Sequence, residues 1–323
     1  MAEESIIGGR LRFLGYAACA LAGCLWGTGF YFGRLALNEM SVEWMVFYRF
    51  LFASLGMLPI LLFYRGGWVR LTRAEMRMLL IASSFGVPIQ FLLQFHGLAR
   101  TTVSHASLMV GAMPVLLAAA AAFFTGERLD RLGWVALCGS TIGAALVTMG
   151  ASRTAAGREI PTLAGDLLVF ASLIIALAWI LLSKKLMETH SAPVVTAYTI
   201  LSGTAMLAVW TLTPLLLSPL THRAVDPVPF AHLSPTAWIA LALSGLLCTA
   251  TTTLLWNWGI HHVPTSRAGV FLNIEPVMGS ILGVELLGEH LGPHAWAGGA
   301  LIMAAAVALT THRHEQEPAV ILE

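Results

Sequence analysis

Charged side chains are scarce in this sequence. Asp, Glu, Lys and Arg make up 11% of the 323 residues, hydrophobic residues make up 57%, and the mean hydropathy is +0.78. Soluble domains carry about 25% charged residues, so water could not solvate this chain as a soluble fold. The formal net charge of +1 is too balanced to suggest nucleic acid as a partner. The deficit of charge therefore predicts a protein whose solvent is the lipid bilayer.

Cysteine is also rare. The sequence has four cysteines, and each falls inside an apolar stretch: Cys19, Cys24, Cys138 and Cys248. Metal sites and disulfides need polar or converging surroundings. We interpret these cysteines as packing residues, and we expect neither a metal nor a cofactor.

Apolar stretches of helix length recur along the whole chain. A helix needs about 20 predominantly apolar residues to cross a bilayer. Ten such stretches are present, at 13–34, 42–64, 76–97, 102–124, 132–150, 164–187, 193–217, 235–259, 264–287 and 293–311. The segments between them are short, and none resembles a soluble domain. The sequence therefore predicts an all-α membrane protein with ten transmembrane helices.

Basic residues in the connecting loops indicate the orientation of these helices. Lys and Arg collect in cytoplasmic loops. With a cytoplasmic N-terminus, twelve of the 18 basic residues fall inside and five outside, and Arg49 lies within a span. We therefore expect a multi-pass protein of the cell inner membrane with both termini in the cytoplasm.

The chain repeats itself when it is shifted by 162 positions. The matches include residues that chance rarely repeats in order: Pro114 with Pro276, Gly126-Glu127 with Gly288-Glu289, and Trp134 with Trp296. Each half then holds five helices, at 13–150 and 164–311, joined by a linker at 151–163. Because five is odd, the halves must have opposite orientations. Inverted repeats are recurrent in secondary transporters, whose substrate site lies near the midplane between the repeats.

These features resemble a known family. The two five-helix halves, the Trp26-Gly27 pair, and the twice-used Pro followed by Gly-Glu and Trp are similar to EamA-type members of the drug/metabolite transporter superfamily. Within that superfamily the chain most resembles the YddG-type exporters of aromatic and other neutral amino acids. The resemblance covers about 13–311 and implies a bundle around a central cavity that works by alternating access. In the first two helices the halves align poorly, since Trp179 matches Trp26 only at a shift of 153.

Ionisable residues inside the spans are the most informative candidates. Arg49 lies in the outer half of the second span, and Glu275 lies at the middle of the ninth, next to Pro276. A charge at a helix centre costs about 2.5–3.5 kcal/mol on insertion scales, so it usually faces a cavity or a partner. Glu275 is a candidate substrate-binding residue, with a structural pair or a protonated carboxyl as the alternative.

Polar side chains at helical spacing predict inward-facing surfaces. Ser83, Gln90 and Gln94 share one face of the third span, as Ser266, Asn273 and Ser280 share one of the ninth. Lipid cannot satisfy an amide, so these faces must point inward. Gln90 and Asn273 are candidate substrate-binding residues, and hydrogen bonding between helices is the alternative.

Two tryptophans lie away from the interfaces where this residue usually collects. Trp26 and Trp179 are near the middle of the first and sixth spans. Facing a cavity, they could form flat apolar walls or bind an ammonium group through cation–π attraction. We include both among the substrate-binding candidates, with plain packing as the alternative.

Glycine pairs at GxxxG spacing predict close approach of helices. They occur at Gly29/Gly33, Gly139/Gly143 and Gly279/Gly283. The two Gly-Glu pairs are interpreted as structural turns in loops.

The function predicted from these residues is a monomeric secondary transporter. Its partners are the bilayer and a small solute, and it exports neutral amino acids, aromatic and other apolar ones included, or related metabolites. Drugs or sugar phosphates are the alternative, although phosphate would need several buried cations. A membrane-embedded enzyme and a channel or receptor are the remaining alternatives. Nothing in the spans has the spacing of a catalytic set, and the two-half repeat speaks against a channel or receptor.

Overall fold

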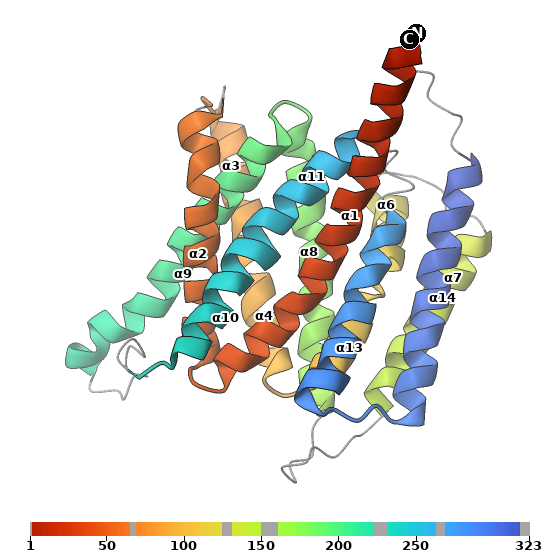
Figure 1. The fold of residues 1–323 in the computed structure, drawn as a ribbon. Helices are drawn as coiled ribbons and strands as arrows, with labels where there is room; N and C mark the ends of the chain where they lie inside the picture. The colour runs from red at the N-terminus through yellow and green to blue at the C-terminus, as the bar shows by residue number, and fades with distance from the viewer. Residues whose placement is uncertain are drawn as a thin grey trace. The chain divides into compact units, whose positions relative to one another are not determined.

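The computed structural model describes an all-helical chain. It covers residues 2–64, 69–124, 131–149, 161–221, 232–262 and 269–316, and no strand occurs among them. The elements are α1 (Ala2–Leu37), α2 (Val42–Phe63), α3 (Arg73–Ser84), η1 (Phe85–Ile89), α4 (Gln90–Leu98), α5 (Val103–Val110), α6 (Met113–Phe124), α7 (Arg131–Met149), α8 (Leu163–Met187), α9 (Ala192–Thr221), α10 (Pro235–Gly245), η3 (Leu246–Thr251), α11 (Thr252–His262), η4 (Gly269–Asn273), α13 (Ile274–Leu287) and α14 (Pro293–Gln316) (Figure 1).

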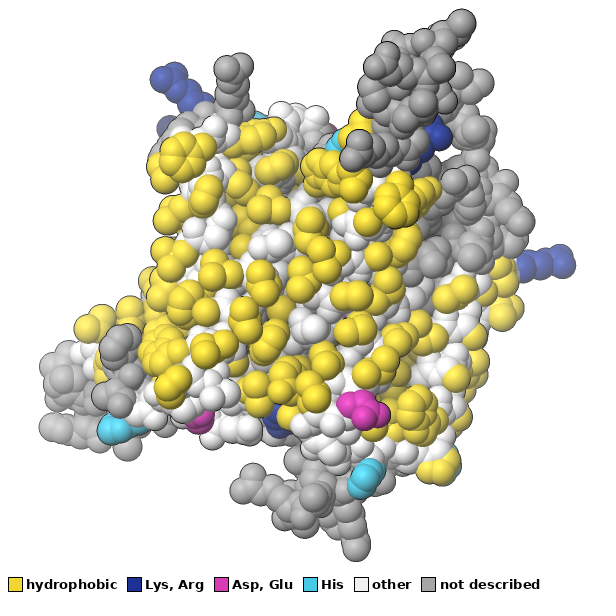
Figure 2. Space-filling model, in the orientation of Figure 1, with side chains coloured by type: hydrophobic (Ala, Val, Ile, Leu, Met, Phe, Trp, Pro, Cys, Tyr) yellow, Lys and Arg dark blue, Asp and Glu magenta, His cyan; other side chains and the backbone are white. Residues whose placement is uncertain are grey.

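Six helices among the described residues are long and apolar enough to cross a membrane. They are Leu11–Leu37, Val42–Phe63, Arg73–Leu98, Leu163–Met187, Ala192–Leu217 and Pro235–Gly259. On the face drawn in Figure 2, hydrophobic side chains cover the length of the helices, and charged side chains lie toward the helix ends. This distribution is what a lipid-facing surface requires.

Two of the other expected spans are interrupted helices. The expected helix at 102–124 is divided into α5 and α6 by a turn at Gly111 and Ala112. The described part of the expected helix at 264–287 is a short 3-10 helix, η4, followed by α13. A proline follows each break: Pro114 is near the start of α6 and Pro276 near the start of α13. Because proline removes an N–H donor, a continuous α-helix is unfavourable at both positions.

The chain forms two compact units, and each draws segments from both halves of the sequence. Unit 1 comprises Met1–Gly27, Thr102–Leu163 and Leu255–Glu323, and unit 2 comprises Thr28–Thr101 and Ala164–Leu254. Helix α1 contributes to both units. The linker expected at 151–163 lies mostly outside the described residues.

Local structure recurs between the two sequence halves. The turn that ends at Ser41, between α1 and α2, has the same form as the turn that ends at Ser191, between α8 and α9. Helices α3 and α10 both begin at a hydroxyl N-cap, Thr72 or Ser234. Both then pass into a π-helical turn, η1 after the 12 residues of α3 and η3 after the 11 residues of α10, and the two turns end at corresponding positions, Ile89 and Thr251.

In unit 2, α2 and α9 are antiparallel neighbours. The start of α2 lies at the end of α4, where Glu43 bonds His96 at 3.1 Å. Helix α9 runs in the direction of α3, because the starts of the two helices meet at Glu75 and His190. The Ser54 hydroxyl of α2 donates to Thr204 Oγ1 of α9 over 2.8 Å. These two residues occupy the same position relative to the recurring turns, so equivalent points of the two helices meet.

In unit 1, α7 packs along α14, and α5 packs along α13. At Gly143 a Cβ atom would lie 2.7 Å from the carbonyl oxygen of Gly298, so backbones approach closely there. This confirms the predicted close approach at Gly143, whereas a Cβ atom at Gly139 would lie no closer than 3.8 Å to its neighbours, an ordinary contact. Helices α5 and α13 are antiparallel, since Gly111 lies at Pro276 while the start of α5 lies at Glu289, beyond the end of α13.

Candidate functional site

The interrupted helices of unit 1 contain two of the five candidate residues. Asn273 is the last residue of η4, and Glu275 lies in the first turn of α13. Paired interruptions at corresponding positions of two repeats are a recurrent feature of transporter binding sites, because they free backbone groups inside the membrane. The break at Gly111 lies against this segment, and a Cβ atom there would be 3.3 Å from Pro276 Cγ.

Asn273 has an unusual environment for an amide. Its side chain is only 5% exposed, and neither the Nδ2 nor the Oδ1 atom has a hydrogen-bond partner. An unpaired buried polar group costs about 1–3 kcal/mol, so this position suits a ligand that offers both a donor and an acceptor.

Glu275 and Trp26 lie on the same part of unit 1. At Gly27 a Cβ atom would be 2.6 Å from the Glu275 carbonyl oxygen, so α1 contacts the first turn of α13. Glu275 is half-buried. The Trp26 ring packs on Trp256 with a centroid separation of 5.5 Å and an interplanar angle of 54°. Aromatic packing therefore accounts for part of the role of Trp26.

Gln90 and Trp179 both lie at the π-helical turn η1 of unit 2. Gly86 makes room for the indole ring, since a Cβ atom there would lie 2.7 Å from Trp179 Nε1. Gln90 follows one turn later on the same side. The indole N–H of Trp179 and the Oε1 atom of Gln90 are buried without hydrogen-bond partners. One lacks an acceptor and the other lacks a donor.

The η1 turn follows from the sequence around Pro88. Proline leaves the carbonyl four residues earlier without its usual donor, and a wider π turn accommodates the mismatch. Such turns are frequent at functional sites. The related turn η3 presents Thr249, which accepts a hydrogen bond from Arg49 Nε over 3.1 Å.

Arg49 is held between aromatic rings. The guanidinium carbon is 5.2 Å from the ring centroid of Phe91 and equally far from that of Phe95, and the residue is 5% exposed. Nearby, Thr28 Oγ1 and Cys248 Sγ are 3.1 Å apart. Cation–π attraction and the Thr249 hydroxyl thus stabilise a buried cation in the second span.

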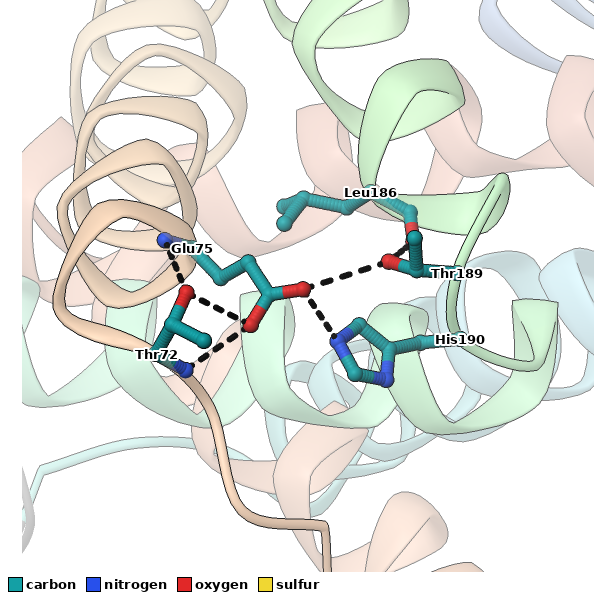
Figure 3. Close-up of polar contacts among 5 residues, drawn as sticks. All are labelled: Thr72, Glu75, Leu186, Thr189 and His190. Atoms are coloured by element: carbon teal, nitrogen blue, oxygen red, sulfur yellow. Dashed lines mark hydrogen bonds and ion pairs between the residues drawn. The ribbon is translucent and has the colours of Figure 1, made fainter.

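Polar contacts at the helix ends hold unit 2 together. Figure 3 shows Glu75 between its own N-cap and the α8–α9 turn: the carboxylate accepts from Thr72 N at 2.8 Å and lies 3.0 Å from His190 Nε2. At the N-cap of α10, Glu39 accepts from the backbone N–H of Ser234 over 2.7 Å and from its hydroxyl over 2.5 Å. The Ser234 hydroxyl and then its backbone N–H lower the pKa of Glu39 below its usual 4.5.

Two buried carboxylates were not among the candidate site residues predicted from the sequence. Asp166 is fully buried and accepts a hydrogen bond from the Thr101 hydroxyl. Glu289 is 8% exposed and accepts hydrogen bonds from the start of α5. Glu289 thus caps the N-terminus of α5, which is consistent with the interpretation of Gly288-Glu289 as structural. Glu127 and Ser266 lie outside the described residues. Among the described residues no three His, Cys, Asp or Glu side chains group as a metal site.

The structure also changes the alignment of the first helices. Counted back from the two recurring turns, Trp179 corresponds to Gly29, and Trp26 corresponds to Ala176. The shift of 153 positions that pairs the two tryptophans therefore differs by about one helical turn from the shift that superposes Ser41 on Ser191.

Comparison with known proteins gives the chain a family. A model of the EamA-like transporter family matches it twice, over residues 13–149 and 163–311. An uncharacterised transporter of Archaeoglobus fulgidus is 25% identical over 301 residues, which is 92% of this chain and 97% of the relative.

Two further relatives carry more specific names. A Salmonella typhimurium protein named "Probable amino-acid metabolite efflux pump" is 27% identical over 293 residues, 87% of this chain and 89% of its own. A Streptantibioticus cattleyicolor protein named "Probable terminal-alkyne amino-acid exporter" is 25% identical over 240 residues, 73% of this chain and 74% of its own.

One crystal structure of another protein shares the fold. Its TM-score with this chain is 0.61 at 18% identity, and the match covers 96% of this chain and 99% of that one.

Proposed function

Because the chain belongs to the EamA-like transporter family, we propose that it exports neutral amino acids, aromatic and other apolar ones included, across the inner membrane by alternating access. The carrying observation is at the η1 turn of unit 2, where the indole N–H of Trp179 and the Oε1 atom of Gln90 are each buried without a hydrogen-bond partner. An amino acid offers an acceptor, a donor and an apolar side chain. The printed names of two relatives, both concerning amino acids, support the same class.

The architecture that we propose is ten spans arranged as two inverted five-helix repeats around a central cavity. The double match of the family model supports a repeat of this length. The antiparallel packing of α5 on α13, and of α2 on α9, supports opposite orientations of the two halves. Cytoplasmic termini remain our proposal from the distribution of basic residues. Periplasmic labelling of a cysteine at Arg70 in intact cells would contradict that orientation.

The substrate proposal is tested with purified protein in liposomes. Counterflow is measured for a panel of amino acids and for a sugar phosphate, with and without a pH gradient. We expect saturable exchange of neutral amino acids, with large apolar ones among the best substrates. Exchange of the sugar phosphate without exchange of amino acids would favour the other solute class.

A substitution at Glu275 tests whether this residue binds the solute or only packs against its neighbours. We propose that its carboxylate meets the ammonium group of the solute, or carries a proton when it does not. Glu275→Gln keeps the shape of the side chain and removes the charge. The variant should insert normally and transport poorly if the carboxylate binds the ammonium. Loss of the response to a pH gradient with retained exchange would indicate a coupling proton. Wild-type transport with lowered thermal stability would show that Glu275 is only structural.

A further inference from the structure

The interface of α5 and α13 contains a polar seam in place of apolar packing. We define the α5–α13 seam by Ser104, Ser107, Ser280 and Glu289; the Ser280 carbonyl oxygen, 3.4 Å from the Ser104 hydroxyl, places Ser280 at this contact. Helix α13 contributes no side chain opposite them at Gly279 and Gly283. A Cβ atom at Gly279 would overlap the Ser107 hydroxyl, and one at Gly283 would overlap the Ser104 hydroxyl and the Glu289 carboxylate. This GxxxG pair therefore makes room for oxygen atoms.

Two hydroxyl groups of the seam have no hydrogen-bond partner. Ser107 is fully buried and Ser280 is 7% exposed, and the Oγ atom of each is unpaired. A serine on a helix can usually donate to a carbonyl of the preceding turn, as Ser83 does to Leu79 over 2.7 Å. Unpaired hydroxyl oxygens in a buried seam are costly unless something binds them.

Glu289 supplies one negative charge to the same seam. Its Oε1 accepts from Val103 N over 2.7 Å, and its Oε2 accepts from Ser104 N over 2.8 Å and from the Ser104 hydroxyl over 2.7 Å. A carboxylate has about four lone-pair positions, so three hydrogen bonds leave capacity for a further contact. The Ser104 hydroxyl also lies 3.4 Å from the carbonyl oxygen of Ser280, which links the two helices.

We propose that the α5–α13 seam binds a sodium ion. The available atoms are one carboxylate and three hydroxyl oxygens, which are hard ligands suited to a hard cation. One carboxylate balances a single positive charge, whereas a calcium ion prefers six to eight oxygens and usually several carboxylates. The ion would satisfy Ser107 and Ser280 and would join the start of α5 to α13. The inference goes beyond solute export, because ion binding can be measured with no solute present.

The experiment compares the thermal unfolding of purified protein in sodium chloride and in choline chloride at equal ionic strength, without any solute. A ligand that binds only the folded state raises the melting temperature in proportion to the logarithm of its concentration above Kd. We expect sodium to raise the melting temperature by about 3 °C over choline for the wild-type protein. Ser107→Ala and Ser280→Ala should each reduce this sodium-dependent rise by at least about half, and the double variant should abolish it.

Ser140→Ala is the matched control. Ser140 on α7 is another buried serine of unit 1 whose hydroxyl is unpaired, and it lies outside the seam. This variant should keep the full sodium effect, whatever its own stability. The proposal is overturned if sodium and choline give equal melting temperatures, if stability follows pH and not sodium, or if the double variant keeps the sodium effect. None of these outcomes bears on the choice of solute.

Discussion

The two sequence halves place different side chains at corresponding points of unit 2. At one point, Gly86 on η1 faces the indole ring of Trp179 on α8. At the corresponding point, Cys248 on η3 faces Gly29 on α1, with 3.3 Å between the Cys248 Cβ and a Cβ built at Gly29. The large and small partners have thus exchanged places. One backbone arrangement therefore leaves a buried indole N–H unpaired at one contact and forms ordinary packing at the corresponding one.

The helix-end contacts differ in the same way. The N-cap of α3 is bridged to a neighbouring turn by its own Glu75, which meets His190. The N-cap of α10 is bridged by a carboxylate from the turn itself, Glu39. Each N-cap is therefore bridged to a turn by one carboxylate, which comes from the capped helix at α3 and from the turn at α10.

The largest expected effect comes from adding a side chain at Gly86, where the Trp179 indole ring packs. Gly86→Ala places a methyl group inside the contact distance of Trp179, and overpacking of this kind costs about 1–3 kcal/mol. Gly29→Ala is the matched variant, because its nearest contacts are 3.3 and 3.4 Å and need little adjustment. Thermal unfolding and liposome transport should show a large loss for the first and a small one for the second. Equal losses would mean that the two contacts are equivalent in strain.

Removing the unpaired donor should affect binding more than stability. Trp179→Phe keeps an aromatic wall and deletes the indole N–H. If that group donates to the solute, KM should rise about 5- to 10-fold, which corresponds to a hydrogen bond of about 1 kcal/mol. Cys248→Ala at the corresponding point should change KM less than about two-fold. A KM for Trp179→Phe equal to that of the wild-type protein would assign the indole to packing alone.

The Glu39 contact predicts a dependence of stability on acid. Its pKa is lowered in the folded chain, so its contribution is present above the usual value of 4.5 and is lost as pH falls through the lower folded value. Glu39→Gln should therefore flatten the stability profile below about pH 4.5, measured by thermal unfolding across pH. A variant with the wild-type acid profile would contradict this role of the Ser234 hydrogen bonds.

The smallest effect is expected at the contact between α2 and α9. In Ser54→Ala, Thr204 keeps its hydrogen bonds to the carbonyl oxygens of Ile200 at 2.7 Å and Phe50 at 3.3 Å. Hydrogen bonds between membrane helices average about 0.6 kcal/mol, so the free energy of unfolding should fall by about that amount. A loss above about 2 kcal/mol would show that this single bond organises the α2–α9 contact.

Much of the framework follows from local patterns. Hydropathy placed the six long spans within a few residues of their bounds in the structure, because lipid requires about 20 apolar residues in any crossing helix. The shift of 162 positions that relates Pro114 to Pro276 also relates the N-caps Thr72 and Ser234. It did not apply to the first two helices of each half, because more residues separate the start of α9 from Ser234 than separate the start of α2 from Thr72, and α9 itself has 30 residues where α2 has 22.

The sequence by itself determined the helical class, the apolar spans, the repeat, and the prolines beside which helices are interrupted. Each of these depends on the chemistry of neighbouring residues. Tertiary structure alone decided that Gly283 faces the Glu289 carboxylate, and that the Trp179 indole is buried with its N–H unpaired. Which atoms share a buried space depends on helices far apart in the sequence, and local periodicity carries no information about that.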